Sequence, residues 1–403
     1  MPVRPEPRSP GNGRNRDIEC LRAMAVIGVA FHHMQGSLFH PGLPWIAQLF
    51  RHAQFWFGVD LFFAISGFVI ARSLLPQMAS DAGNVRQQVG VIGAFWIRRF
   101  WRLLPSAWLW LGLILLATVT CNRSGAFGSL HANLMATLAA VFNVANFRFA
   151  DAIFRYEYGA SFVYWSLSLE EQFYLLLPLL VVVLRRRVDL LMVSLVLLQL
   201  CLFRTTLLMS IRTDALALGV LLAIAAPGRM YAVLRPRFLL HLRSLRVLPP
   251  CLLLACLAWL ASTDPWALPL RISAIAVVSA VLVWLASYDN DYLLPESCFK
   301  RTLVWIGARS YAIYLIHVPA YFLLRELCIR LGASMTVPSW LLALLAIGLI
   351  ALLADLNYRL LEQPLRERGR RLAESFGQRW KDRQLPVDTP ALLPSPGPVG
   401  DGQ

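Results

Sequence analysis

The sequence predicts an all-α protein, a polytopic bundle of transmembrane helices. Of its 403 residues, 58% are hydrophobic and only 15% are charged, and the mean hydropathy of +0.57 lies above the range of ordinary soluble domains. Apolar runs long enough to cross a bilayer recur along the chain. The formal net charge of +15 comes from bases that gather between these runs, as in cytoplasmic loops, so we expect no nucleic-acid partner.

Eleven apolar segments are candidates for membrane crossing. Clusters of arginine or lysine follow the second, fifth, seventh, ninth and last of them, and such clusters mark the cytoplasmic side of a membrane. The segments are 18–36, 55–75, 104–121, 131–147, 162–184, 188–203, 206–225, 247–262, 267–287, 303–324 and 338–360.

One segment between the second and fifth cannot cross if all basic clusters are cytoplasmic. The weakest candidate there is 131–147, which is short and carries Asn133, Asn143 and Asn146. We expect it to be re-entrant or interfacial, which leaves about ten spanning helices and both termini in the cytoplasm. The alternative has eleven spans and places the arginine-rich segment 366–383 outside, against the positive-inside pattern.

Three parts are expected along the chain. Residues 1–16 form a disordered basic cytoplasmic tail, 17–366 the transmembrane domain, and 367–403 a cytoplasmic tail that is basic and then Pro-rich. The first part lacks the apolar core and cleavage site of a signal peptide, so we expect no cleavage. The seven cysteines are scattered and have no CxxC spacing, so neither a disulfide framework nor a metal site is indicated.

The first apolar segment carries an arginine near one end and two histidines near the other. Arg22 and His33 are eleven residues apart, which is three helical turns to within about 20° and a rise of ~16 Å. The two therefore share one helix face, and His32 points elsewhere. With Arg22 near the cytoplasmic interface, His33 lies near mid-membrane, where an ionisable group marks a functional cavity. In the alternative, Arg22 is a snorkelling anchor and His33 an interhelical hydrogen bonder.

The second segment places Asp60 and Ser66 among aromatic residues. Gly58 and Gly67 in the same segment allow a neighbouring helix to approach closely. A lone buried aspartate there is compatible with a structural role as well as with a functional one.

Arginines open the third segment. Arg99 and Arg102 are three residues apart, so they share a helix face and can clamp a phosphate by charge-assisted hydrogen bonds, and Arg98 precedes them. Their cytoplasmic position also suits a purely topological role.

The fifth segment begins with a polar stretch, "YWSLSLEEQFY". Ser166, Ser168, Glu170 and Glu171 lie at the predicted outer entry of this span. Two adjacent carboxylates are costly at a membrane entry unless they are used, although serine and glutamate there also cap helices.

Three later stretches add further polar side chains. Arg212 and Asp214 lie at the mouth of a span, where a mutual ion pair is the structural alternative to a functional role. Tyr314 and His317 share a face at i, i+3 well inside the bilayer. Glu362 comes just before a proline that is expected to stop the last helix. Six such constellations in a chain this apolar favour a buried polar cavity.

The motifs also carry a resemblance to a known family. Their order along the chain is "LRAMAVIGVAFHH", "GVDLFFAISGFVI", "RRFWRLLP", "YWSLSLEEQFYLLLP", "RTDALALGVLLA", "SYAIYLIHVP" and "LEQP". This order resembles the acyltransferase-3 family of integral membrane acyltransferases across residues 16 to 366. The family signature of an arginine, ten residues and a histidine falls on Arg22 and His33. Glu19 and Cys20 depart from the family's usual aspartate and glycine.

The resemblance implies an O-acyltransferase of the bacterial inner membrane. Such an enzyme moves an acyl group, often acetyl, from cytoplasmic acyl-CoA to a hydroxyl of a glycan, a lipid-linked sugar or a similar acceptor. Acyl-CoA is then a co-substrate, no cofactor is bound permanently, and membrane lipid surrounds the protein.

The resemblance and the chemistry of the residues together assign roles. His33, Arg22 and Glu170 are expected to be catalytic, with His33 as general base or as carrier of the acyl group; the sequence leaves both open. Arg98, Arg99 and Arg102 are expected to bind the coenzyme. Substrate-binding or supporting roles are expected for Glu19, Asp60, Ser66, Trp165, Ser168, Arg212, Asp214, Tyr314 and His317.

Two other classes of function compete with this one. Intramembrane histidine, glutamate and arginine also mark proton-coupled secondary transporters of small polar solutes, but the sequence shows no inverted repeat. A non-catalytic sensor or scaffold is the third class. The acyl chain, the acceptor and the oligomeric state are not encoded in any motif of this chain.

Overall fold

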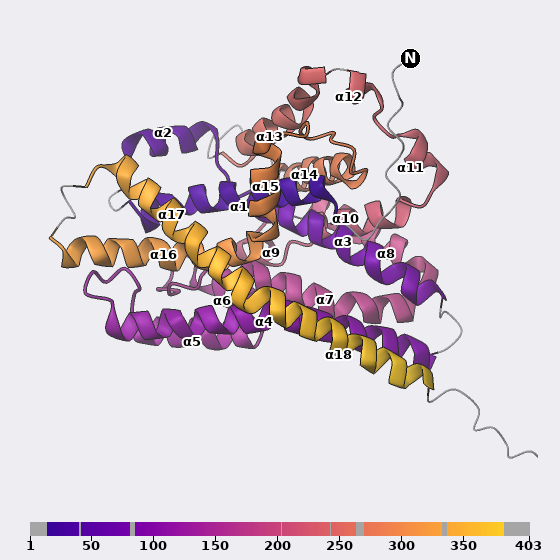
Figure 1. Ribbon diagram of the computed structural model, residues 1–403, viewed down its shortest axis with the longest axis horizontal. Helices are drawn as coiled ribbons and strands as arrows, with labels where there is room; N and C mark the ends of the chain where they lie inside the picture. The colour runs from indigo at the N-terminus through magenta and orange to yellow at the C-terminus, as the bar shows by residue number, and fades with distance from the viewer. Residues whose placement is uncertain are drawn as a thin grey trace, which may run out of the picture.

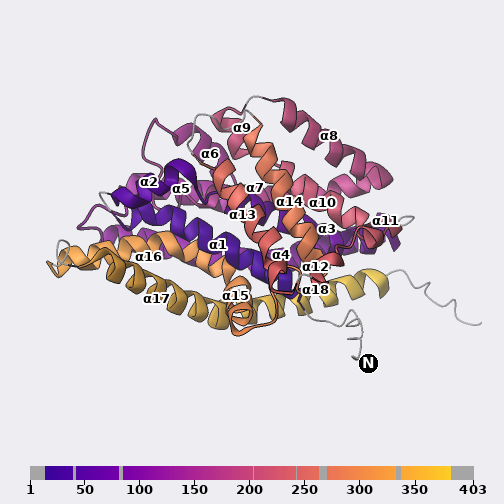
Figure 2. The same ribbon diagram turned by 90° about the horizontal axis from the view of Figure 1, so that it is seen from above.

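The described part of the chain is a bundle of helices with no strand (Figure 1). This computed structural model describes residues 14–39, 42–80, 85–202, 204–241, 243–262, 270–332 and 337–382. Several long helices, such as α1 and α16, run roughly along one axis in both views, whereas α14 crosses them at a steep angle (Figure 2). The predicted fold class is therefore confirmed. Of the predicted disordered tail 1–16, residues 1–13 lie outside the described residues, and Arg16 already begins α1. Of the predicted tail 367–403, residues 383–403 lie outside the described residues.

The helices fall into long and short elements. The long ones are α1 (Arg16–Ser37), α3 (Gly58–Ser80), α4 (Val85–Thr120), α7 (Tyr164–Leu184), α14 (Arg271–Ser287), α16 (Ser310–Arg330), α17 (Ser339–Asn357) and α18 (Gln363–Asp382). Those of intermediate length are α2 (Pro44–His52), α5 (Leu130–Val141), α6 (Ala145–Ala152), α8 (Val188–Cys201), α10 (Asp214–Ala225), α13 (Leu248–Leu260) and α15 (Cys298–Ala308). Short turns of helix are α9 (Thr206–Ser210), α11 (Arg229–Val233), α12 (Phe238–His241), η1 (Arg185–Arg187), η2 (Arg243–Val247) and the π-helix η3 (Tyr358–Glu362).

The described residues of each of the eleven predicted apolar segments lie mainly in helix. Among the described residues, six helical runs are long and apolar enough to cross a membrane: Gly58–Ala79, Gln87–Thr120, Tyr164–Leu184, Thr206–Ala225, Ser310–Arg330 and Ser339–Trp380. The number of ten crossings stays a prediction. The predicted segment 303–324 is two helices, α15 and α16, which meet at Arg309.

The segment 131–147 is broken, as a non-crossing segment would be. It consists of α5 and α6, and Asn143 between them has a φ of 56°, in the left-handed region. The twelve residues of α5 extend over ~18 Å, less than the ~30 Å of a hydrocarbon core.

Close helix contacts occur at three glycines, of which Gly58 and Gly67 were named from the sequence and Gly219 was not. Gly67 on α3 lies against the carbonyl of Leu216 on α10, and Gly219 on α10 lies against the carbonyl of Ala64. A Cβ at Gly58 would approach the carbonyl oxygen of Ala25 on α1 to 2.5 Å. Any larger residue would push these helices apart, so α1, α3 and α10 form the tightly packed centre of the bundle.

We expected the last helix to stop before Pro364, but the helix continues past this residue. The chain passes through the π-turn η3, where the N–H of Gln363 bonds to the carbonyl of Tyr358. A wider turn tolerates the missing N–H of the proline, so α17 continues into α18. Helix α18 packs along α4, with Phe376 against Gly93 (Figure 1). The first part of the predicted basic tail, residues 367–382, therefore belongs to this helix.

Candidate active site

A polar cavity lies between five helices near the middle of the bundle. Its polar and charged walls are Arg22 on α1, Ser66 on α3, Arg99 and Arg102 on α4, Ser166, Glu170, Glu171 and Tyr174 on α7, and Ser310, Tyr311 and Tyr314 on α16. It encloses about 70 Å³. A buried site needs about 10–15 Å³ to hold one water, so this cavity has room for several water-sized groups. We call it the arginine cavity.

The arginines of this cavity have no carboxylate partner at ion-pair distance. Among the described residues, no ion pair includes Arg22, Arg99 or Arg102, and Nε of Arg22 is buried without a hydrogen-bond partner. The Arg99 guanidinium lies over the rings of Phe95 and Tyr174, 5.4 Å from each centroid. Partly buried guanidinium groups that lack anions are suited to an anionic ligand.

Glu170 is the best-anchored carboxylate of the cavity. It accepts hydrogen bonds from the hydroxyls of Ser66 and Tyr174. The three arginines interact with it electrostatically, and Glu171 lines the same cavity. The cavity wall thus carries three guanidinium groups and two carboxylates, and Glu19 and Glu362 interact with Arg102 from outside the wall.

His33 lies beyond the arginine cavity, where it contacts a second histidine. Its Nδ1 is 2.9 Å from Nε2 of His317, and Nδ1 of His317 is 3.2 Å from the carbonyl oxygen of Ile313. A carbonyl only accepts, so Nδ1 of His317 carries the proton and its Nε2, in the neutral ring, accepts from His33. This leaves Nε2 of His33 with a free lone pair, the tautomer that a general base needs.

His33 and His32 contact each other edge-on, with 5.4 Å between ring centroids, but they have different further partners. His33 packs edge-on against Phe162, with 5.2 Å between ring centroids, whereas His32 stacks on Phe50. Arg22 and His33 both face α16, in agreement with the spacing. They do not share one cavity, because Arg22 lines the arginine cavity beside Tyr314 while His33 meets His317, nearly a turn further along α16.

Asp60 and Arg212 form a separate buried ion pair. Nε of Arg212 is 2.7 Å from one carboxylate oxygen of Asp60 and Nη2 is 3.0 Å from the other. Trp56 and Trp165 cover the guanidinium. Arg212 and Asp214 thus do not form the ion pair considered as their structural alternative, because Asp214 pairs with Arg204 at 2.6 Å. The two side chains diverge because Arg212 precedes α10 and reaches across to α3.

Four other predicted site residues lie away from the arginine cavity. Arg98 faces a surface pocket next to Glu374 of α18. Ser168 accepts a hydrogen bond from the N–H of Ala145 and so joins α7 to α6. Trp165 stacks between Phe149 and Arg212. Glu19 is buried behind the cavity, and its Oε2 has no hydrogen-bond partner in the structure.

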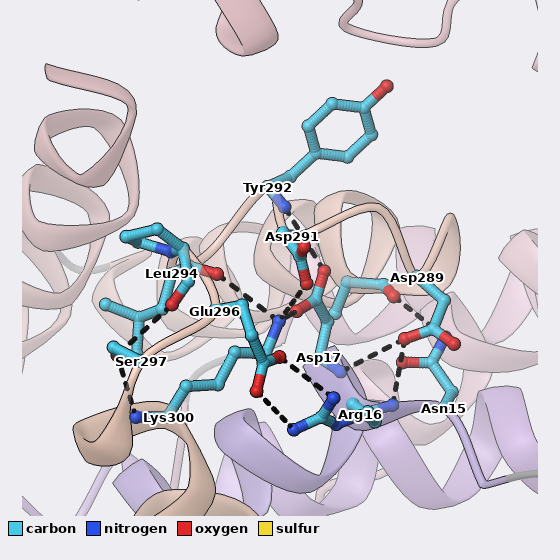
Figure 3. Close-up of polar contacts among 12 residues, drawn as sticks. Asn15, Arg16, Asp17, Asp289, Asp291, Tyr292, Leu294, Glu296, Ser297 and Lys300 are labelled. Atoms are coloured by element: carbon cyan, nitrogen blue, oxygen red, sulfur yellow. Dashed lines mark hydrogen bonds and ion pairs between the residues drawn. The ribbon is translucent and has the colours of Figure 1, made fainter. Parts of the chain in front are cut away.

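A second polar cluster holds the start of α1 and was missed by the sequence analysis (Figure 3). Lys300 of α15 is fully buried, and its Nζ is 2.5 Å from Asp17, 2.6 Å from Asp291 and 3.3 Å from the carbonyl of Leu294. We call Asp17, Asp291 and Lys300 the lysine cluster. The sequence showed Lys300 only as a topological base, because its partner Asp17 is 283 residues away.

The loop 288–297, which carries Asp291 of the lysine cluster, also caps the helix α1 that carries Arg22. Asp289 accepts from the N–H groups of Arg16 and Asp17 at 2.9 and 3.4 Å, and Arg16 pairs with Glu296 at 2.8 Å (Figure 3). Asn15 donates to the carbonyl of Ala286. The first turn of α1 is therefore fixed to the loop 288–297, and Arg22 follows less than two turns later.

Comparison with known proteins gives the class. Residues 15–357 match the model of the acyltransferase-3 family, described as an acyltransferase domain. The match covers most of the chain, so the protein belongs to this family. No solved structure matches the chain.

Several curated proteins are similar to the chain. The putative peptidoglycan O-acetyltransferase YrhL of Bacillus subtilis is 28% identical over 392 residues, which cover 90% of this chain and 56% of that protein. The peptidoglycan O-acetyltransferase OatA of Listeria monocytogenes is 27% identical, with 87% of this chain and 56% of that protein covered. A putative O-acetyltransferase of Staphylococcus aureus (strain COL) is 26% identical, with 87% and 57% covered. The chain thus spans a little over half the length of these relatives.

Proposed function

We propose that this protein is a membrane O-acyltransferase that moves an acyl group, acetyl in the first instance, from acyl-CoA to a hydroxyl of a glycan such as peptidoglycan. The observation that carries the proposal is the arrangement along α1 and α16: unpaired arginines at one level and a histidine pair at the next. The names of the relatives support the acetyl group and the glycan.

The arginine cavity supplies the donor side. Arg22, Arg99 and Arg102 would bind the phosphate-bearing coenzyme by charge-assisted hydrogen bonds, with the thioester directed toward His33. The predicted topology puts these arginines and both termini on the cytoplasmic side, where acyl-CoA is present, and puts Glu170 of the same cavity toward the outside. The coenzyme would therefore enter the cavity from its arginine side.

The histidine pair supplies the base. Nε2 of His33 takes the proton of the acceptor hydroxyl as its oxygen attacks the thioester carbonyl carbon. The C–O bond of the ester forms, the C–S bond breaks, and the coenzyme leaves as its thiolate, which the proton held by His33 neutralises. His317 holds the ring of His33 in the required tautomer through its own bond to Ile313.

An acyl-histidine relay is the second route. In that route Nε2 of His33 itself attacks the thioester and then passes the acyl group to the hydroxyl. Both routes use the same lone pair, so they make the same demand on His33. Rapid quenching that traps labelled protein in the absence of acceptor distinguishes them.

The test uses the neighbouring histidines as their own control. Full-length protein in nanodiscs receives radiolabelled acetyl-CoA and soluble peptidoglycan fragments. We expect His33→Ala to lower acetyl transfer per folded molecule by about 10²- to 10⁴-fold, the usual contribution of a general base, and His32→Ala to keep most of it. Equal activity in the two variants would contradict the assignment. Absence of transfer by the wild-type protein, together with uptake of a solute into vesicles, would favour a transporter.

A further inference from the structure

A pocket on the far side of the histidine pair has no role in the donor reaction. It measures about 390 Å³, a size typical of small-molecule sites. Its walls are Ala126, Phe127 and Gly128 between α4 and α5, Phe149, Ala152 and Ile153 at α6, residues 156–160 and Phe162 before α7, and Phe322 on α16. We propose that this aromatic pocket binds a sugar ring of the acceptor glycan. The inference rests on the proposed function and names the acceptor site for it.

The position of the pocket follows from the register of α16. Tyr314 lines the arginine cavity, His317 contacts His33, and Phe322 lines the aromatic pocket. Eight residues separate Tyr314 from Phe322, a rise of ~12 Å. The arginine cavity and the aromatic pocket therefore lie on opposite sides of the histidine pair, as a donor site and an acceptor site should.

Phe162 connects the pocket to the base. Its ring lines the pocket and packs edge-on against His33, with 5.2 Å between centroids. A ligand in the pocket is thus one side chain away from the free nitrogen of His33. The predicted topology also places the loops before α5 and α7 outside, where a cell-wall glycan is present.

The chemistry of the walls suits a sugar ring. The C–H groups on the faces of a pyranose pack on aromatic rings, and this pocket offers Phe149, Tyr156, Tyr158 and Phe322. Sugar hydroxyls need hydrogen-bond acceptors, and Glu157 lines the pocket while it holds the N–H of Ser129 at 3.1 Å. An apolar wall with a few polar groups is the usual composition of a ligand site.

Buried polar contacts hold the pocket in shape. Arg148 lies over the rings of Tyr156 and Tyr158, 5.2 Å from each centroid, and donates to the carbonyl of Tyr158. Asn133 donates to the carbonyl of Phe127 at 2.6 Å and accepts from the N–H of Ala160 at 2.8 Å, so it joins the two loops. A pocket held in this way loses little entropy when a ligand binds.

Two neighbouring aromatic residues provide a matched test. Tyr156 lines the pocket and is 45% exposed, while Phe154 in the same turn is fully exposed and is not part of the wall. We expect Tyr156→Ala to raise the KM for soluble peptidoglycan fragments roughly tenfold, with the KM for acetyl-CoA unchanged. Phe154→Ala should leave both constants unchanged.

A conservative variant separates the ring from its hydroxyl. The Tyr156 hydroxyl donates to Asp151 at 2.8 Å, so the ring alone should serve the sugar, and Tyr156→Phe should retain the wild-type KM for the glycan. The KM for acetyl-CoA reports on the donor side in each variant, and Phe154→Ala, outside the pocket wall, is the control for unchanged transfer. If wild-type protein transfers acetyl and Tyr156→Ala has a normal KM for glycan, this inference fails alone. If wild-type protein transfers none to any glycan, the proposed function fails and the inference with it.

Discussion

The lysine cluster and the arginine cavity both hold charged side chains inside the bundle, but only the lysine cluster pairs its cation with carboxylates at ion-pair distance in the described structure. Lys300 has two carboxylates and a carbonyl within 3.3 Å, so each buried charge of the lysine cluster has a partner within the protein. Arg22, Arg99 and Arg102 have no such ion pair in the described structure. The first arrangement is complete as it stands, and the second is complete only with an added anion.

The difference distinguishes structural from functional charge. Breaking a buried pair leaves an uncompensated charge and is costly to the fold. Removing an unpaired charge relieves desolvation and electrostatic repulsion, so the fold should not suffer, whereas a ligand that needed the charge should. Stability and activity measurements on the two regions should therefore give opposite results.

The largest effect on stability is expected at Lys300. Lys300→Met should lower the free energy of unfolding by about 3–5 kcal/mol, because Asp17 stays buried without its cation. Thermal unfolding of the purified protein in detergent measures this. Asp17→Asn combined with Lys300→Met removes both charges and should recover much of the loss. A single variant as stable as the wild type would contradict the structural reading of this cluster.

The next effect is on ligand binding and has no counterpart in stability. Arg102→Gln should leave the free energy of unfolding unchanged or raise it. The same change should increase the KM for acetyl-CoA by about tenfold to a hundredfold, from the ~1.5–3 kcal/mol of a hydrogen bond to a charged group. Arg102→Lys should restore part of the affinity, since lysine keeps the charge and lacks the planar fork.

The control for Arg102 is the KM for acetyl-CoA, measured at increasing salt concentration in the wild type and the variant. Wild-type affinity should fall as ionic strength rises, and the variant should depend on salt less steeply. A destabilised Arg102→Gln protein with an unchanged donor KM would place this arginine with the structural charges.

The smallest effect on stability is expected at Glu296, an exposed residue of the loop next to the lysine cluster. The hydrogen bond from Arg16 lowers the pKa of Glu296 below its usual value, with a further bond from Arg301. A carboxylate with a lowered pKa stabilises the fold at pH values above its unfolded pKa, and this contribution disappears as the pH falls through the folded pKa. Wild-type and Glu296→Gln proteins should thus differ slightly near neutral pH and converge in acid. A difference that grows in acid would contradict the sign.

The sequence predicted what depends on local spacing and composition. The helical positions, the close contacts at Gly58 and Gly67, and the different directions of His32 and His33 follow from periodicity within one segment. Arg22, Arg99 and Arg102 line one cavity. Glu170, which we expected at the outer entry of its span, lines the same cavity, and the roles of all four stay predictions.

What depends on distant partners was not predictable. Arg212 has an acid two residues away in sequence, yet it pairs with Asp60, 152 residues distant, because side chains at a helix start diverge. The lysine cluster needs a loop whose path no local pattern gives. The continuation of α17 past Pro364 needs a π-turn, which resembles an ordinary helix end in sequence.

Phe162, His33 and His317 lie between the arginine cavity and the aromatic pocket, and the ring of His33 contacts the other two. A protein that carried whole metabolites across this level would need a wet passage, and such a passage leaks protons. On the proposed function, only a small acyl group passes this layer, while the coenzyme stays on the side where it was made. The thioester then supplies the free energy for decorating an external polymer, and the electrochemical gradient of the membrane is left intact.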